Sequence, residues 1–329
     1  MNELEWVRVF ASIVLQATPL MIAVCGETIT ERAGIVNLSL DGTMLLSAMT
    51  GFIAGLLTGS VWLGFLAAAL IGGLFALILA FSAIRLRKDQ FAVGFVLTLM
   101  GEELSAFLGQ NYTRIPGESV THWGIPILKD IPVLGPIFFD HDLLVYFAFV
   151  LVGFTWWWVF RTQAGLRLRS AGDRPETGFA RGVDIQRLRY LYTIVGGALV
   201  GIAGAAYSLD IKLGWSEGHT RGLGWIALAI VIFGGWSPIR GALGALLFGA
   251  SKALATVLQR RFPEVSVVAF NATPWVLMIA VLMLVGSDLS ERLITLAPER
   301  YRPRLRHMLR VSAPNALGKA FSTGGSEGG

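Results

Sequence analysis

Long apolar runs with few charged residues constrain this 329-residue chain more than any other feature. A helix needs about 20 mostly apolar residues to cross the hydrocarbon core of a bilayer. Eight runs approach or exceed that length, at 7–24, 35–57, 61–84, 91–110, 143–160, 190–209, 241–258 and 267–286. They are continuous rather than alternating, which favours helices over a β-barrel, because in lipid a helix satisfies its own backbone. A shorter run at 223–236 is typical of a thin span or a re-entrant half-helix. We therefore expect an all-α polytopic bundle of about eight to ten transmembrane helices.

The composition excludes an ordinary soluble domain, since 54% of the residues are hydrophobic and only 15% are charged. The single cysteine, Cys25, excludes an internal disulfide, and the four histidines are too scattered for a metal cluster. Glu3 and Glu5 precede the first apolar run and no small-residue cleavage site follows it, so we expect that run to be retained rather than removed as a signal peptide.

The arginines predict the orientation, because loops rich in Lys and Arg stay in the cytoplasm. The 161–189 loop contains seven arginines and only three acidic residues. We therefore place it in the cytoplasm, together with the basic 85–88 turn. The acidic 111–142 loop should face outward. The sequence thus divides into a transmembrane domain, 1–290, and a basic cytoplasmic tail, 291–329, with a flexible "STGGSEGG" end. Nine crossings would place the N-terminus outside and also leave "QRR" at 259–261 outside, against the charge rule. Topology explains most of the net charge of +5, so no nucleic-acid partner is implied.

Polar side chains inside the apolar runs are candidates for a solute pathway, because each is costly at membrane depth. Asn37, Ser39 and Asp41 lie in "GIVNLSLDG", and Glu102 lies near the outer end of its run, where it either faces the pathway or is simply interfacial. Asn37 and Asp41 are four residues apart and would share one face of a helix. That face would line a polar cavity, or Asp41 would cap or cross-link neighbouring helices.

A weak internal sequence repeat, called the echo below, suggests a duplicated architecture. "GIVNLSL" from Gly34 and "GLGWIAL" from Gly222 share the positions of a glycine, an aliphatic residue, a small residue and a leucine. Corresponding glycine-broken segments in two halves are where transporters tend to build a central site. The echo pairs Asn37 with Trp225, a combination that suits a flat ring with hydrogen-bonding edges, although Trp225 is equally compatible with plain packing.

Five longer stretches resemble a known family. They are "ERAGIVNLSLDGTMLL" at 31–46, "VGFVLTLMGEELSAFLG" at 93–109, "IPVLGPIFFDHDLLVY" at 131–146, "RTQAGLRLRSAGDRPETGFARGVDI" at 161–185 and "GLGWIALAIVIFGGWSPIRGALGALLFG" at 222–249. With these the chain resembles the permease subunits of bacterial ABC importers of the branched-chain amino acid and simple sugar type. "NLSLDG" is most similar to the "NIALEG"-like stretch of the nucleoside branch, with Asp41 in place of the usual glutamate, whereas sugar permeases have an "IDLSVG"-like stretch there.

The resemblance implies a multi-pass protein of the bacterial plasma membrane that forms the pathway for a small polar solute, most closely a nucleoside, and that is not itself an enzyme. It implies a second, homologous or identical permease subunit, an extracytoplasmic solute-binding lipoprotein, and a cytoplasmic ATPase that carries the ATP and Mg, with no cofactor in this chain. The chain has no G-x-x-x-x-G-K-[ST] motif with which to hydrolyse ATP itself. Simple sugars or another small solute are the alternative substrates. A proton-coupled secondary carrier that uses Asp41 or Glu102 is the alternative mechanism. A membrane-embedded hydrolase is a third class, but the apolar runs hold no evident set of nucleophile, base and orienting group.

A short helix is predicted in the cytoplasmic loop. Asp173 and Glu176 fit a capping box, Pro175 suits the first turn and Gly182 suits the end, so the helix would run over residues 174–181. The resemblance implies that this is the coupling helix, which docks into a groove on the ATPase. Its expected residues are Gly172, Asp173, Arg174, Pro175, Glu176, Thr177, Gly178, Ala180 and Gly182, with Gly178 and Ala180 forming a small surface in water. A basic amphipathic helix lying on anionic lipid is the alternative.

Overall fold

The computed structural model describes residues 3–286, 298 and 312–321. Our expectations for the tail arginines between 292 and 310 and for the "STGGSEGG" end concern residues outside that part.

Seven helices in the described part are long and apolar enough to cross a membrane. They are α1 (Glu3–Arg32), α2 (Leu40–Thr58), α3 (Val61–Ile84), α4 (Gln90–Gly109), α5 (Leu143–Arg161), α8 (Ile185–Ala206, continued by the π-helical η3, Tyr207–Ile211) and α10 (Pro238–Arg261). Two of the predicted runs fold as shorter helices, α9 (Leu223–Phe233) and α12 (Thr273–Gly286), and the single turn α11 (Val267–Asn271) precedes α12. The all-α polytopic bundle is confirmed. The described residues contain seven full-length candidate spans, and α12 ends at Gly286, the last residue described before 298.

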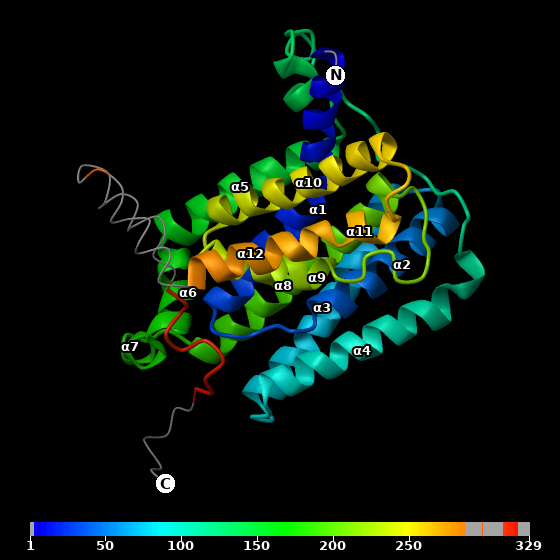
Figure 1. Cartoon of the computed structure of the whole chain (residues 1–329). Helices are drawn as coiled ribbons and strands as arrows, with labels where there is room; N and C mark the ends of the chain where they lie inside the picture. Colours follow the sequence, from blue (N-terminus) through cyan, green and yellow to red (C-terminus); the bar gives the residue numbers. More distant parts are fainter. Residues whose placement is uncertain (1–2, 287–297, 299–311, 322–329) are drawn as a thin grey trace.

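Helix α1 lies at the centre of the bundle, where it contacts α5, α8, α9 and α10 (Figure 1). Helix α8, which packs on α1, also packs against α2 and α3. Helix α4 lies at one edge of the bundle (Figure 1). Glycines allow the closest approaches. A Cβ built on Gly72 would lie 2.2 Å from the carbonyl oxygen of Gly197, and one on Gly26 would lie 2.4 Å from that of Gly196. Only small residues permit such backbone contact between helices in lipid.

Helix α2 begins five residues later than its apolar run predicts, because residues 33–39 are not helical. The side chain of Asn37 explains the break, since its Oδ1 accepts hydrogen bonds from both the backbone N–H and the hydroxyl of Ser39. Such local side-chain bonds give the backbone an alternative to the helical ladder.

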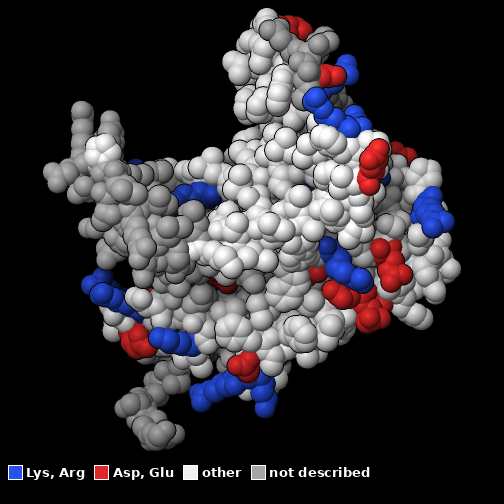
Figure 2. Space-filling view, viewed as in Figure 1, with Lys and Arg blue, Asp and Glu red and all other residues white. Residues whose placement is uncertain are grey.

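The arginine-rich loop between α5 and α8 folds into α6 (Gln163–Asp173) and α7 (Pro175–Ala180) at one end of the bundle (Figure 1). Charged side chains gather toward this end and toward the opposite end, with a mostly uncharged surface between them (Figure 2). By its charge the α6–α7 end is the cytoplasmic one.

Candidate functional site

The broken segment before α2 holds a buried polar network. The amide of Asn37 donates to Oε2 of Glu27 at 3.1 Å, and the hydroxyl of Ser39 lies 2.6 Å from Oδ1 of Asn37 and 3.3 Å from the hydroxyl of Thr43. All four residues are buried. The expectation that Asn37 and Asp41 share one helix face is wrong, because Asn37 lies in the non-helical segment before α2. The polar atoms of Asn37 and Ser39 bind one another and α1 instead.

Asp41, in the first turn of α2, caps the N-terminus of α9. Its Oδ1 accepts the N–H groups of Gly222 and Gly224 at 2.8 and 2.9 Å, and its Oδ2 accepts that of Gly222 at 3.0 Å. The first N–H groups of a helix have no partner within the helix, and they favour a negative group. The contact is so close that a Cβ on Gly224 would lie 2.3 Å from the backbone nitrogen of Asp41. Of the two roles considered for Asp41, this geometry supports the cross-link between helices.

The other end of α9 is held by a second buried acid. The indole N–H of Trp236 donates to the carboxylate of Glu31, and Nε of Arg32 donates to the carbonyl oxygen of Trp236 at 3.1 Å. Arg240 donates to the carbonyl oxygen of Gly235 at 3.2 Å. These bonds stabilise a turn in which Trp236 has a φ of +53°.

Helix α9 is thus a short helix fixed at both ends. Its 11 residues extend about 16 Å, roughly half the thickness of the hydrocarbon core. The two echoed segments lead into α2 and α9, and the N-termini of these two helices meet at Asp41. Broken helices whose N-termini converge are typical of the central sites of transporters.

Sequence reasoning missed Glu27 and Glu31, both completely or almost completely buried on α1. The predicted first span ended at residue 24, shortly before the next charged residue, Glu27, whereas α1 continues to Arg32. The available signal was the spacing of four residues between the two acids, which places them on one helix face.

Glu102 and Trp225 lie beside this network without joining it. Glu102, half-buried on α4, is near enough to Asp41 for their charges to interact. Helices α2 and α4 meet there, since a Cβ on Gly42 would lie 2.4 Å from the carbonyl oxygen of Thr98. Trp225 is half-buried on α9, while Asn37 bonds to Glu27 and Ser39.

The predicted helix in the cytoplasmic loop exists as α7, but the capping box is wrong. Thr162 caps α6 by accepting the N–H of Gly165, and α6 then runs through Asp173, which leaves Asp173 at a helix C-terminus. Arg174 takes the N-cap position of α7 without a side-chain bond. Pro175 in the first turn and the left-handed Gly182, with a φ of +80°, agree with the prediction. Helix α7 has six residues instead of eight.

The expectation that Gly178 faces water is also wrong. Gly178 is buried, and a Cβ on it would lie 3.0 Å from both Cδ1 of Ile185 and Oγ of Ser170, so it faces α8 and α6. Gly172 likewise packs inward, because a Cβ on it would lie 2.3 Å from the carbonyl oxygen of Arg32. The exposed side of α7 consists of Glu176, Thr177, Phe179 and Ala180.

Residues 312–321 pack against this cytoplasmic end, which sequence reasoning did not anticipate. The N–H of Ala316 donates to the carbonyl oxygen of Gly172 at 2.8 Å, and Arg189 donates to that of Lys319 at 2.9 Å. The rings of Phe321 and Phe179 have centroids 5.9 Å apart. The segment therefore contacts α6, α7 and α8 together.

Comparison with known proteins identifies the family. Residues 9–287 match the model of the "branched-chain amino acid transport system / permease component" family. The chain is 39% identical over 245 residues to a putative glucose ABC transporter permease, TsgC13, of Haloferax volcanii, covering 72% of this chain and 74% of that one. It is 36% identical over 260 residues to the nucleoside permease NupC of Lactococcus lactis, covering 76% and 82%. It is 35% identical over 284 residues to the guanosine permease NupQ of Bacillus subtilis, covering 81% and 88%.

No solved structure matches the chain. The family match spans most of the chain, and the apolar helices agree with it. The chain belongs to the branched-chain amino acid transport permease family and is a multi-pass ABC transporter permease of the bacterial plasma membrane.

Proposed function

We propose that the chain is the permease subunit of an ABC importer for nucleosides. The observation that carries this proposal is the similarity, over most of both chains, to a nucleoside permease and a guanosine permease. The "NLSLDG" stretch supports it, because it resembles the nucleoside branch and lies where the N-termini of α2 and α9 meet. A second permease subunit and an extracytoplasmic binding lipoprotein would complete the pathway.

A cytoplasmic ATPase, with its ATP and Mg, would supply the energy through α7. Helix α7 exposes Phe179, 47% accessible, at the cytoplasmic end. An exposed large aromatic residue on a short helix suits a groove on a partner protein. The aromatic side chain and the packing of α7 between α6 and α8 favour protein docking over a lipid-bound loop.

A chain of contacts leads from α7 to the solute pathway. Helix α7 packs on α6, where Gly172 touches the carbonyl of Arg32. Arg32 binds the Trp236 turn at one end of α9, and Asp41 binds the other end. A displacement of α7 by the ATPase would therefore reach α9 through packed and hydrogen-bonded groups.

Reconstitution tests the proposal. The chain would be placed in proteoliposomes with its partner ATPase and binding lipoprotein, and uptake of labelled nucleosides would be measured with ATP inside. We expect uptake that needs ATP and that excess unlabelled ribose or glucose does not reduce. Uptake by this chain alone under a pH gradient would instead indicate a secondary carrier.

A sugar permease is the second candidate, because a putative glucose permease shares 39% identity with this chain. Uptake of labelled glucose or ribose that excess nucleoside leaves unchanged would favour it and contradict the nucleoside assignment.

A further inference from the structure

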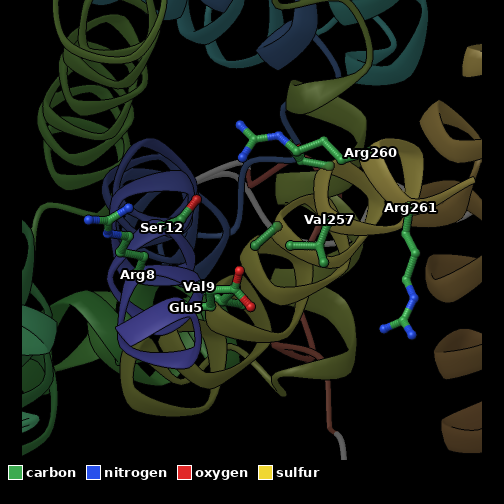
Figure 3. Close-up of a pocket in the computed structure, with 9 residues that line it drawn as sticks. Glu5, Arg8, Val9, Ser12, Val257, Arg260 and Arg261 are labelled. Carbon is green, nitrogen blue, oxygen red and sulfur yellow. The ribbon is translucent and has the colours of Figure 1, made fainter. Parts of the chain in front are cut away.

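Two adjoining cavities open at the end of the bundle opposite α7. The larger, about 750 Å³, lies between the N-terminal part of α1 and the C-terminal part of α10 (Figure 3). The smaller, about 270 Å³, lies beside it, and Thr256 lines both. The two cavities are therefore neighbours at the outer end of the bundle.

The charged lining of the two cavities is mostly basic, with one acid, Glu5, in the larger. Arg8 on α1 and Arg260 and Arg261 on α10 line the larger cavity (Figure 3), and Lys212 lines the smaller one. The positive-inside rule disfavours such residues at the outer end. The outward "QRR" that topology alone did not explain thus lies at the entrance to a cavity, where cations attract electron-rich solutes.

The smaller cavity combines amide, aromatic and cationic side chains. They are Gln16 of α1, Tyr207 of η3, Lys252 and Gln259 of α10, and Phe270 of α11. Its volume is just below the roughly 300 Å³ at which typical small-molecule pockets begin. Its lining is more polar than apolar, and the Tyr207 and Phe270 rings add flat surfaces, so hydrogen bonds would contribute much of the binding of a small planar ligand.

Lys252 is the informative residue of this cavity. It lies within a helix apolar enough to cross a membrane, where a charge is costly and marks a functional site by default. Its ammonium lies 5.1 Å from the centroid of the Tyr207 ring, and no carboxylate among the described residues is within ion-pair distance of it. The Tyr207 ring is in turn fixed by stacking on His219, with centroids 5.6 Å apart. The lysine is thus held in place by a cation–π contact, with donors left for a ligand.

We propose that this cavity binds the base of the transported nucleoside and prefers oxo bases, such as hypoxanthine, guanine and uracil, to amino bases. The assignment rests on the proposed function. An ammonium has donors and no acceptor, and lysine accordingly pairs with O6 and N7 of guanine. At the 6-position of a purine or the 4-position of a pyrimidine, the amino group of adenine or cytosine would face the ammonium donor to donor, whereas the oxo group of hypoxanthine, guanine or uracil would accept from it. The amides of Gln16 and Gln259 can complete the polar edge, and the Phe270 ring offers a flat surface for stacking.

Competition for uptake of labelled inosine by the complete reconstituted complex tests the assignment. We expect unlabelled inosine, guanosine and uridine to compete at least about tenfold more strongly than adenosine or cytidine, since one well-placed base contact discriminates by about 1–3 kcal/mol. In Lys252→Met, the concentration of unlabelled inosine that halves the uptake should rise about tenfold. The corresponding concentration of adenosine should change by less than about twofold. Lys88→Met, at an exposed cytoplasmic turn, is the matched control and should change neither value.

Lys252→Met should assemble, because it removes a charge from a membrane helix at nearly constant length. Gln259→Leu is a second variant of the same cavity, and it too should weaken inosine competition. Equal competition by inosine and adenosine in the unaltered complex would overturn the assignment, as would unchanged inosine competition in both variants. Absence of any nucleoside uptake by the unaltered complex would overturn the proposed function and this assignment with it.

Discussion

Individual buried polar residues in this chain are satisfied by partners far away in the sequence. Asp41 receives its hydrogen bonds from residues 181 and 183 positions later, and Glu31 from one 205 positions later. The sequence shows that such residues are costly at membrane depth and therefore partnered. It does not show the partner, because the choice between a cavity and another helix depends on how the bundle packs.

Replacing Asp41 tests its role as a helix cap. Asp41→Leu would leave the N–H groups of Gly222 and Gly224 buried without an acceptor, at about 1–3 kcal/mol for each. We expect a lower melting temperature and a lower yield of the detergent-purified chain. Asp41→Asn keeps one acceptor oxygen, so it should lower the melting temperature and the yield by less. A Leu variant with unchanged melting but no uptake would instead assign Asp41 to the solute pathway.

At the scale of elements, hydropathy predicts most helices well and their breaks poorly. The run at 61–84 coincides with α3 because the run is apolar throughout, with no charged side chain and no proline to interrupt the helix. The late start of α2 depends on Asn37 bonding to Glu27 and Ser39, which hydropathy does not describe. The capping box at Asp173 was wrong for a similar reason. Local spacing suggested a helix start, but α6, already capped at Thr162, continues through that residue.

The two sides of α7 should respond differently to substitution. Phe179→Ser removes the exposed ring of α7 together with its contact to the Phe321 ring. We expect at most a small change in the melting temperature, but loss of co-purification with the ATPase. Gly178→Trp should destabilise the chain itself, because even a Cβ there meets Ile185 and Ser170 at 3.0 Å. Melting curves and co-purification of the two variants separate these effects. Normal assembly and transport by Phe179→Ser would contradict the coupling role of α7.

For the whole molecule, the contacts from α7 through Gly172 and Arg32 to the Trp236 turn join the cytoplasmic end to α9. The same end receives residues 312–321, which bind Gly172 and Gly34 through their backbone. Composition predicted a bundle and a basic cytoplasmic surface. It could not predict this junction, because backbone carbonyls and glycines provide most of its contacts and these leave no mark in hydropathy or charge.

The Trp236 turn gives the sharpest test of this connection. Trp236→Phe keeps the packed ring but removes the N–H that donates to the buried Glu31, so the end of α9 loses one of its attachments. Because α7 and its exposed Phe179 are untouched, we expect the complex to assemble and hydrolyse ATP at a near-normal rate. Nucleoside uptake per ATP should nevertheless fall several-fold, because movement at α7 is then passed less faithfully to α9 and Asp41. Trp62→Phe is the matched control, since Trp62 is 60% exposed on α3, and it should leave the uptake per ATP unchanged. An unchanged ratio in Trp236→Phe would mean that α9 is driven through other contacts, with α8, which packs against both α7 and α1, as the next route to test.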